Sequence, residues 1–196
     1  MRLAPALLIL LGFSSAQACA DSIRVFAEPN YEGWNKVILS PRASLGQDGS
    51  GYRVRSLRVR SGGWLLCSDT SFNGDCIWAS QDLSDLDAIH FSHRVMSAKP
   101  GVTSVSRYHW GGRSPPYQSL VLFPERGYEG KWMAFSKDLQ RPAKAPLRAG
   151  SIVVRGGIWQ LCSDPDYSGR CLTVAGDIWD LSEIFFGPIL SVRRLK

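Results

Sequence analysis

One ten-residue pattern occurs twice in the chain. CSDTSFNGDC runs from Cys67 to Cys76, and CSDPDYSGRC runs from Cys162 to Cys171. Each copy carries a cysteine at both ends and aromatic-x-Gly near its centre. A unit that recurs at a fixed spacing predicts a duplicated structure, in which neighbouring units bury a face that one unit cannot bury alone.

A related pattern, aromatic-x4-aromatic-x-Gly, stands at two further places. FAEPNYEG occupies residues 26–33 and FPERGYEG occupies residues 123–130, and in the cysteine segments a cysteine takes the place of the first aromatic residue. Gly33 and Gly130 are 97 positions apart, and Gly74 and Gly169 are 95 apart. The four units therefore alternate in the order A, B, A, B, and the chain is a duplicated pair.

The segments between these units predict strands. They are short, rich in branched and aromatic residues, and separated by Gly, Ser, Asp and Pro: SLRVR, WLLCS, CIWAS, LVLFP, SIVVR and WQLCS. QDLSDLDAI and its copy GDIWDLSEI each suggest a single helical turn, with Asp82 and Asp177 as its caps. The fold class is therefore all-β, a sandwich in each of two domains.

The expected domains follow from the repeat. The first domain spans residues 21–99 and the second spans residues 119–196. Residues 100–118 (PGVTSVSRYHWGGRSPPYQ) match neither copy and are rich in Gly, Ser and Pro, which is typical of a linker.

The first twenty residues predict a secretory signal peptide. Arg2 supplies a positive start, Ala6–Phe13 is an apolar run too short to span a bilayer, and small residues follow it. Cleavage after Ala18 or after Ala20 is expected, so the mature protein is secreted or periplasmic. Lipidation of Cys19 is the alternative. No later stretch approaches membrane length.

Cysteine counting favours cleavage after Ala20. That cut removes Cys19 and leaves four cysteines, an even number that suits two disulfides in an exported protein. Four cysteines allow three connectivities. Each pair brackets a short segment with NG or SG at its centre, so we favour the local pairs Cys67–Cys76 and Cys162–Cys171, provided that each segment is a hairpin.

With four such motifs in alternating register, the chain resembles the βγ-crystallin family. The resemblance implies Greek-key motifs, two per domain, covering nearly all of the mature chain. It assigns the fold-back position, where a positive φ is expected, to Gly33, Gly74, Gly130 and Gly169. It assigns the serine that packs over each hairpin to Ser56, Ser97, Ser151 and Ser191. The cysteine-tied hairpins depart from the lens proteins and point to a secreted microbial relative.

Many microbial members bind calcium through (Asn/Asp)-(Asn/Asp)-x-x-(Ser/Thr)-Ser, because calcium takes six to eight oxygen ligands. The corresponding runs here are Gly51–Ser56, Ser92–Ser97, Pro146–Ser151 and Phe186–Ser191. None has the acidic pair, and the fifth place holds Arg55, Met96, Gly150 or Leu190. An arginine there repels a cation. We expect no cofactor and no usual calcium site, and interpret Asp82, Asp85, Asp87, Asp177 and Asp180 as capping residues.

No catalytic group emerges from the remaining polar residues. His90, His93 and His109 lack acidic or cysteine partners at metal-ligand spacing, and no serine has an evident base. Three tryptophans fall in strand patterns and are expected in the cores: Trp64, Trp78 and Trp159. Trp34 and Trp132 are expected partly at the surface, and Trp110 in an exposed or interdomain contact.

The net charge of +6 is moderate and scattered along the chain, which favours a soluble basic surface and also permits an anionic partner. We expect an exported, non-enzymatic structural or binding protein. An anionic cell-envelope glycan is one candidate partner, on a basic face formed by Arg53, Arg55, Arg58 and Arg60. The alternatives are a secreted peptidase inhibitor acting through Asp69–Asn73 or Pro165–Ser168, and a calcium-binding stress protein. Nucleic acid is not expected, and the oligomeric state stays open.

Overall fold

The computed structural model describes residues 21–46, 51–91, 94–101, 116–142 and 145–196. The expected signal peptide, His93, His109, Trp110 and residues 102–115 of the expected linker lie outside these ranges. The fold is all-β, as predicted, with short 3-10 turns between the strands.

The first half contains β1 (Ser22–Phe26), η1 (Pro29–Tyr31), β2 (Asn35–Ile38), β3 (Tyr52–Arg53), β4 (Ser56–Ser61), β5 (Gly63–Cys67), η2 (Thr70–Phe72), β6 (Cys76–Ala79), η3 (Asp87–Ile89), β7 (Arg94–Val95) and β8 (Ser97–Gly101). The second half contains β9 (Leu120–Phe123), η4 (Arg126–Tyr128), β10 (Met133–Phe135), β11 (Ser151–Val154), β12 (Trp159–Cys162), η5 (Pro165–Tyr167), β13 (Cys171–Ala175) and β14 (Ser191–Arg194).

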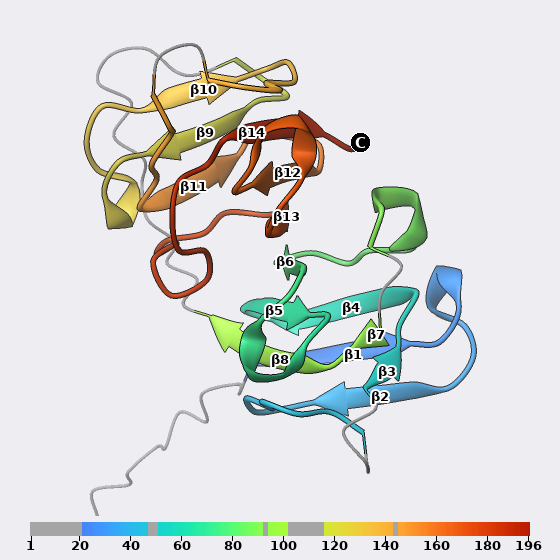
Figure 1. The fold of residues 1–196 in the computed structure, drawn as a ribbon. Coiled ribbons are helices and arrows are strands. Elements are labelled where there is room, and N and C mark those ends of the chain that lie inside the picture. Colours follow the sequence, from blue (N-terminus) through green and yellow to red (C-terminus); the bar gives the residue numbers. More distant parts are fainter. Residues whose placement is uncertain (1–20, 47–50, 92–93, 102–115, 143–144) are drawn as a thin grey trace, which may run out of the picture.

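The strand order is that of Greek keys. One three-stranded sheet has the order β2-β1-β4, and its copy has the order β10-β9-β11. In both, the last strand returns to lie beside the first, which is the Greek-key connection. A six-stranded sheet, ordered β14-β12-β13-β6-β5-β8, contains strands from both halves, and β3 pairs with β7 (Figure 1).

The two halves meet where β6 and β13 pair in parallel. The register runs from Cys76 opposite Leu172 to Ala79 opposite Ala175. Figure 1 shows β6 and β13 at the junction of the two halves. The Trp78 indole N–H donates to the Asp177 carbonyl at 3.0 Å, so a side chain of the first domain is anchored in the second.

The six-stranded sheet is buried on both faces, as β5 illustrates. Trp64 and Leu66 point into a core shared with β1, β2 and β4. Leu65 and Cys67 point the other way, into the core that lies under β9 and β11. A strand covered on both faces reads as a continuous apolar run, which explains why GWLLC has no polar alternation. Trp64, Trp78 and Trp159 are fully buried, which confirms the prediction for these three.

Strand β8 extends into the expected linker. Gly63 pairs with Gly101, and Trp64 with Pro100, so residues 100 and 101 belong to the sheet. A Cβ at Gly101 would clash with the ring of Trp78. Gly101, which was expected in the linker, is therefore needed for the close packing of Trp78.

The expected capping by Asp82 and Asp177 is wrong. Asp82 accepts the Val59 N–H at 2.8 Å and Asp177 accepts the Val154 N–H at 2.8 Å, so each ties its loop to a strand. Both segments form a β-bridge to that strand, and in the first segment the 3-10 turn η3 begins only afterwards. Asp85 caps that turn instead, accepting the N–H of Asp87 at 3.0 Å.

Candidate binding sites

The four serines singled out in the sequence make the same two hydrogen bonds. Each hydroxyl donates to a hairpin carbonyl at 2.6 Å, and each is fully buried. Each also accepts the N–H of the second aromatic residue of its motif at 2.9 or 3.0 Å. The pairs are Ser56 with Tyr31, Ser97 with Phe72, Ser151 with Tyr128, and Ser191 with Tyr167.

The motif glycines allow the hairpin to fold back over the sheet. Gly33, Gly74, Gly130 and Gly169 have φ between 74° and 86°, the left-handed region that favours glycine. In the first motif of each domain, two aromatic rings pack edge to face, Phe26 with Tyr31 at 5.8 Å and Phe123 with Tyr128 at 6.0 Å.

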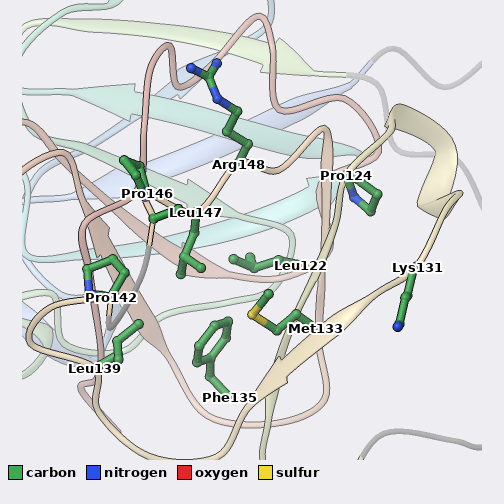
Figure 2. Close-up of a pocket in the computed structure, with 11 residues that line it drawn as sticks. Leu122, Pro124, Lys131, Met133, Phe135, Leu139, Pro142, Pro146, Leu147 and Arg148 are labelled. Carbon is green, nitrogen blue, oxygen red and sulfur yellow. The ribbon is translucent and has the colours of Figure 1, made fainter.

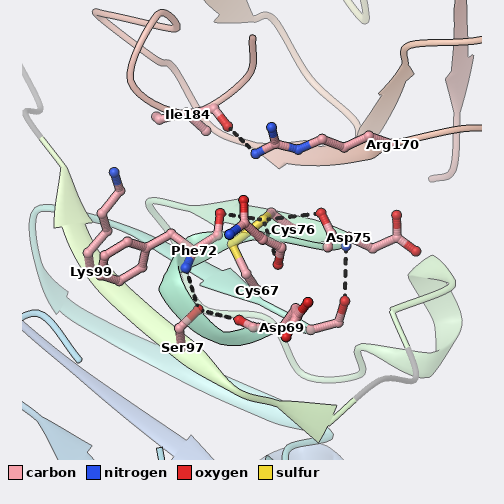
Figure 3. Close-up of a disulfide and its surroundings, with 12 residues drawn as sticks. Cys67, Asp69, Phe72, Asp75, Cys76, Ser97, Lys99, Arg170 and Ile184 are labelled. Carbon is pink, nitrogen blue, oxygen red and sulfur yellow. Dashed lines mark hydrogen bonds between the residues drawn. A yellow bond between two sulfur atoms is a disulfide. The ribbon is translucent and has the colours of Figure 1, made fainter. Parts of the chain in front are cut away.

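In the second motif, a disulfide stands where the first aromatic residue stood. Cys67 bonds to Cys76 and Cys162 bonds to Cys171, the two local bridges favoured from the sequence. Figure 3 shows Cys67–Cys76 beneath the hairpin, with Ser97 joined to Asp69 and Phe72. The motif serines and these four cysteines are thus engaged in holding the fold.

The hairpins proposed to face a peptidase are tightly folded. Ser71 and Phe72 have φ of 54° and 63°, and Asp166 and Tyr167 have φ of 59° and 61°. The Lys99 ammonium lies 4.9 Å from the Phe72 ring centroid and covers it. Neither hairpin presents an extended segment of the kind that adds to a partner as a strand.

The four arginines do not share one basic face, contrary to expectation. The chain leaves strand geometry between β3 and β4, so the alternation of side chains is interrupted. Arg55 binds Glu28 at 3.0 Å and Asp87 at 2.8 Å, and its charge is balanced. The guanidinium of Arg58 lies over Tyr31, 4.2 Å from the ring centroid. Arg53 and Arg60 are exposed on different strands.

The candidate calcium runs hold apolar or basic groups in the described part of the chain. In the first run, the Arg55 guanidinium lies between two carboxylates, where it satisfies both. In the described ranges, no group of three or more His, Cys, Asp or Glu side chains is placed to hold a metal ion. His90 is exposed at the end of η3, with φ of 57°.

A hollow of about 310 Å³ opens beside the edge strand β2. We call it the first hollow; its lining is Lys36, Val37, Ile38, Leu39, Arg42, Ser44, Leu45, Gly46 and Tyr52. Trp34, with 47% of its surface exposed, packs edge to face on Tyr52 at 5.5 Å. The described lining contains two cations and no carboxylate, so the first hollow is an aromatic and basic surface.

A larger hollow of about 520 Å³ opens beside β10 in the second domain. We call it the second hollow; its lining is Leu122, Pro124, Lys131, Met133, Phe135, Leu139, Pro142, Ala145, Pro146, Leu147 and Arg148. In Figure 2 the apolar side chains face a common space, Lys131 lies to one side of it, and the guanidinium of Arg148 is directed away from it.

The two hollows are copies of one place in the duplicated fold. Arg42 forms a β-bridge to Ala98, and Leu139 forms the equivalent β-bridge to Val192. Ala98 and Val192 each directly follow a motif serine. Tyr52 pairs with Val95, which stands two positions before the motif serine of its unit. Leu147 bridges Ile189, which stands two positions before the motif serine of the other unit. Lys36 and Met133 likewise each stand three positions after a motif glycine. The two cations of the first hollow are thus replaced by Leu139 and Met133 in the second.

Sequence reasoning did not identify either hollow. The signal was present, because the segments after Gly33 and Gly130 can be aligned position by position, and the change from Lys and Arg to Met and Leu is visible there. What the sequence lacked was the knowledge that these positions surround one space, together with a later segment of the chain. Among the described residues, no helix is long and apolar enough to cross a membrane.

Comparison with known proteins gives consistent matches. The family model described as Beta/Gamma crystallin matches residues 22–100 and 119–195. Mouse beta-crystallin B1 is 28% identical over 191 residues, which cover 88% of this chain and 68% of the mouse protein. Human beta/gamma crystallin domain-containing protein 2 is 27% identical over 153 residues, which cover 76% of this chain but only 8% of the human protein.

Among solved structures, geodin, a beta-gamma crystallin from Geodia cydonium, is similar over 89% of this chain and 99% of its own. The identity is 15% and the TM-score is 0.33.

Proposed function

The chain belongs to the Beta/Gamma crystallin family, and from this premise we propose that it is an exported, non-enzymatic binding module whose first hollow holds an anionic glycan. The observation that carries the proposal is the pairing of aromatic and basic groups in that hollow. Trp34 and Tyr52 form an exposed aromatic corner, and Lys36 and Arg42 lie in the adjoining lining.

Each group has a defined part in glycan binding. The apolar C–H face of a sugar ring packs on an exposed aromatic ring, which offers a large contact area at little cost in side-chain entropy. The carboxylate or sulfate of an acidic sugar forms charge-assisted hydrogen bonds with Lys36 and Arg42. A neutral glycan would leave those two cations without a partner, so the hollow favours acidic sugars over neutral ones.

The disulfides support an exported location. Disulfides form and persist in oxidising compartments and are rare in the cytosol. Both bridges close short hairpins, at a sequence separation of 9 residues each. Together with the N-terminal segment expected to be a signal peptide, they favour a secreted or periplasmic protein.

The state of the nucleophilic side chains supports a non-enzymatic role. The four described cysteines are oxidised, so none supplies a thiolate. The four motif serines each donate one hydrogen bond and accept another, so their hydroxyls are committed to the backbone. We also propose that the usual calcium sites of the family are lost, because the Arg55 guanidinium holds the carboxylates of Glu28 and Asp87.

The test is binding of acidic oligosaccharides to the oxidised mature protein by isothermal titration calorimetry. An oligogalacturonate and a sulfated oligosaccharide are expected to bind, and a neutral oligosaccharide of equal length is not. Trp34→Ala and Lys36→Gln should each weaken binding by about tenfold, or ~1.4 kcal/mol. Lys137→Gln, an exposed lysine of the second domain, is the matched control and should leave binding unchanged.

Two results would refute the proposal. One is equal binding of neutral and acidic oligosaccharides. The other is an equal loss in Lys36→Gln and Lys137→Gln, because binding would then follow net charge and not the first hollow.

A further inference from the structure

We propose that the second hollow binds a single-chain amphiphile with an anionic head, of which a long-chain fatty acid is the natural source. The first support is the divergence of the two copies. The positions that hold Lys36 and Arg42 in the first hollow hold Met133 and Leu139 in the second. The site kept its place in the fold and became apolar at these two positions, while Lys131 and Arg148 remain in its lining.

The shape and lining of the second hollow suit an aliphatic chain. Leu122 and Phe135 lie on neighbouring strands, and the side chains of Leu139 and Leu147 face the same space (Figure 2). Its volume of about 520 Å³ lies within the range of roughly 300–1,000 Å³ typical of small-molecule sites. That space admits one acyl chain and not the two chains of a membrane phospholipid.

Met133 lies exposed at the mouth of the second hollow. Covering its apolar side chain with a ligand would remove that surface from water, which is favourable. Met133 has 50% of its surface exposed although it lies on a strand and borders the hollow. A methionine adapts its shape readily to an apolar ligand, since it has three rotatable bonds and a polarisable sulfur. An alkyl chain placed against Met133 and Phe135 removes that surface from water.

The charges at the margin select the sign of the head group. Lys131 and Arg148 border the hollow, and its described lining contains no carboxylate. Within the described residues, neither cation forms a hydrogen bond or ion pair, and both side chains are exposed. A carboxylate head at the mouth therefore meets one of two cations while its chain lies among the leucines.

The experiment is calorimetric titration of the oxidised mature protein with sodium dodecanoate below its micelle-forming concentration. One chain is expected to bind per protein. Across octanoate, decanoate and dodecanoate, the affinity should rise by about fourfold per methylene until the hollow is filled. Dodecyltrimethylammonium, with the same chain and a positive head, should bind at least tenfold more weakly. Dodecyl phosphate, with the same chain and a different anionic head, should also bind, because the head meets the same two cations.

Matched variants locate the site. Met133→Glu places a negative charge at the mouth, on a half-exposed side chain whose replacement leaves the core intact, and should abolish binding. Lys36→Glu introduces glutamate at the equivalent position of the first hollow. It should leave dodecanoate binding unchanged. Retention of the circular dichroism spectrum and the unfolding midpoint shows that each variant is folded.

Equal binding by Met133→Glu and wild type would overturn the proposal, and so would equal affinity for the anionic and cationic amphiphiles. Binding of many chains per protein with loss of structure would also overturn it, because that is the behaviour of a detergent. The hollows lie in different domains, and the glycan titration does not involve Met133, so the failure of one proposal is distinguishable from the failure of the other.

Discussion

Replacing Trp78 should destabilise the second domain although the residue belongs to the first. Its indole is 1% exposed, packs within the core formed by β9, β11, β12 and β13, and donates a hydrogen bond to the Asp177 carbonyl. Truncating a buried tryptophan to alanine costs roughly 3–5 kcal/mol. The lost hydrogen bond adds about 1 kcal/mol, so Trp78→Ala should lower the free energy of unfolding by about 4–6 kcal/mol.

Native-state hydrogen exchange is the assay, because it reports on each strand separately. The amides of Leu161 on β12 and Leu172 on β13 should exchange about a thousandfold faster in Trp78→Ala, the equivalent of ~4 kcal/mol. Trp78→Phe keeps most of the ring and loses the hydrogen bond, so its effect should be several times smaller in free energy. Unchanged exchange at Leu161 and Leu172 in Trp78→Ala would refute the idea that the halves share a core.

Three further predictions concern the motif serines, alkaline pH and calcium. Ser151→Ala should lower the free energy of unfolding in guanidinium by about 2–4 kcal/mol, because the hydroxyl makes two buried hydrogen bonds. Ser119→Ala, which loses the bond to the Pro116 carbonyl, should cost about 1 kcal/mol. Equal losses in the two variants would contradict this. Burial, and secondarily the charge of Asp177, raises the pKa of Tyr128. As pH rises above about 10, the unfolded chain loses the phenol proton of Tyr128 before the folded protein does, so stability should fall with increasing pH. Tyr128→Phe should show a shallower decline of the unfolding midpoint with pH. The same slope in wild type and Tyr128→Phe would count against this. Millimolar calcium, compared with chelator, should leave the midpoint unchanged, and a clear rise would reveal a calcium site.

The repeat made most of the fold predictable. Aromatic-x4-aromatic-x-Gly is a local pattern, and the backbone conformations it needs are set by residues within eight positions of each other. The Cys67–Cys76 pairing followed for the same reason, since the two residues face each other across one hairpin. These features depend on short-range geometry, which a sequence displays directly.

The junction between the halves was not predictable in the same way. The β6–β13 pairing joins residues about 96 positions apart, and CIWAS and CLTVA carry no mark of being adjacent. Gly101 was assigned to a linker because its need for close packing depends on Trp78, a residue distant in sequence. Asp82 was assigned to a helical cap because its real partner, the Val59 N–H, is on another strand.

The candidate sites were missed for a related reason. A basic face was expected from the alternation of Arg53, Arg55, Arg58 and Arg60, but the strand is interrupted and Arg55 is neutralised by two carboxylates. The basic groups of the first hollow, Lys36 and Arg42, are separated by several residues without regular alternation. Only the tertiary fold brings them to one space.

The most direct test of the central claim is chemical-shift mapping of the ¹⁵N-labelled oxidised protein during titration with an oligogalacturonate. The account predicts that the Trp34 indole N–H and the amides of Lys36, Arg42 and Tyr52 shift together and saturate with one affinity, while the second domain is unaffected. Shifts spread over the exposed lysines and arginines of both domains, or confined to a surface away from Trp34, would contradict it.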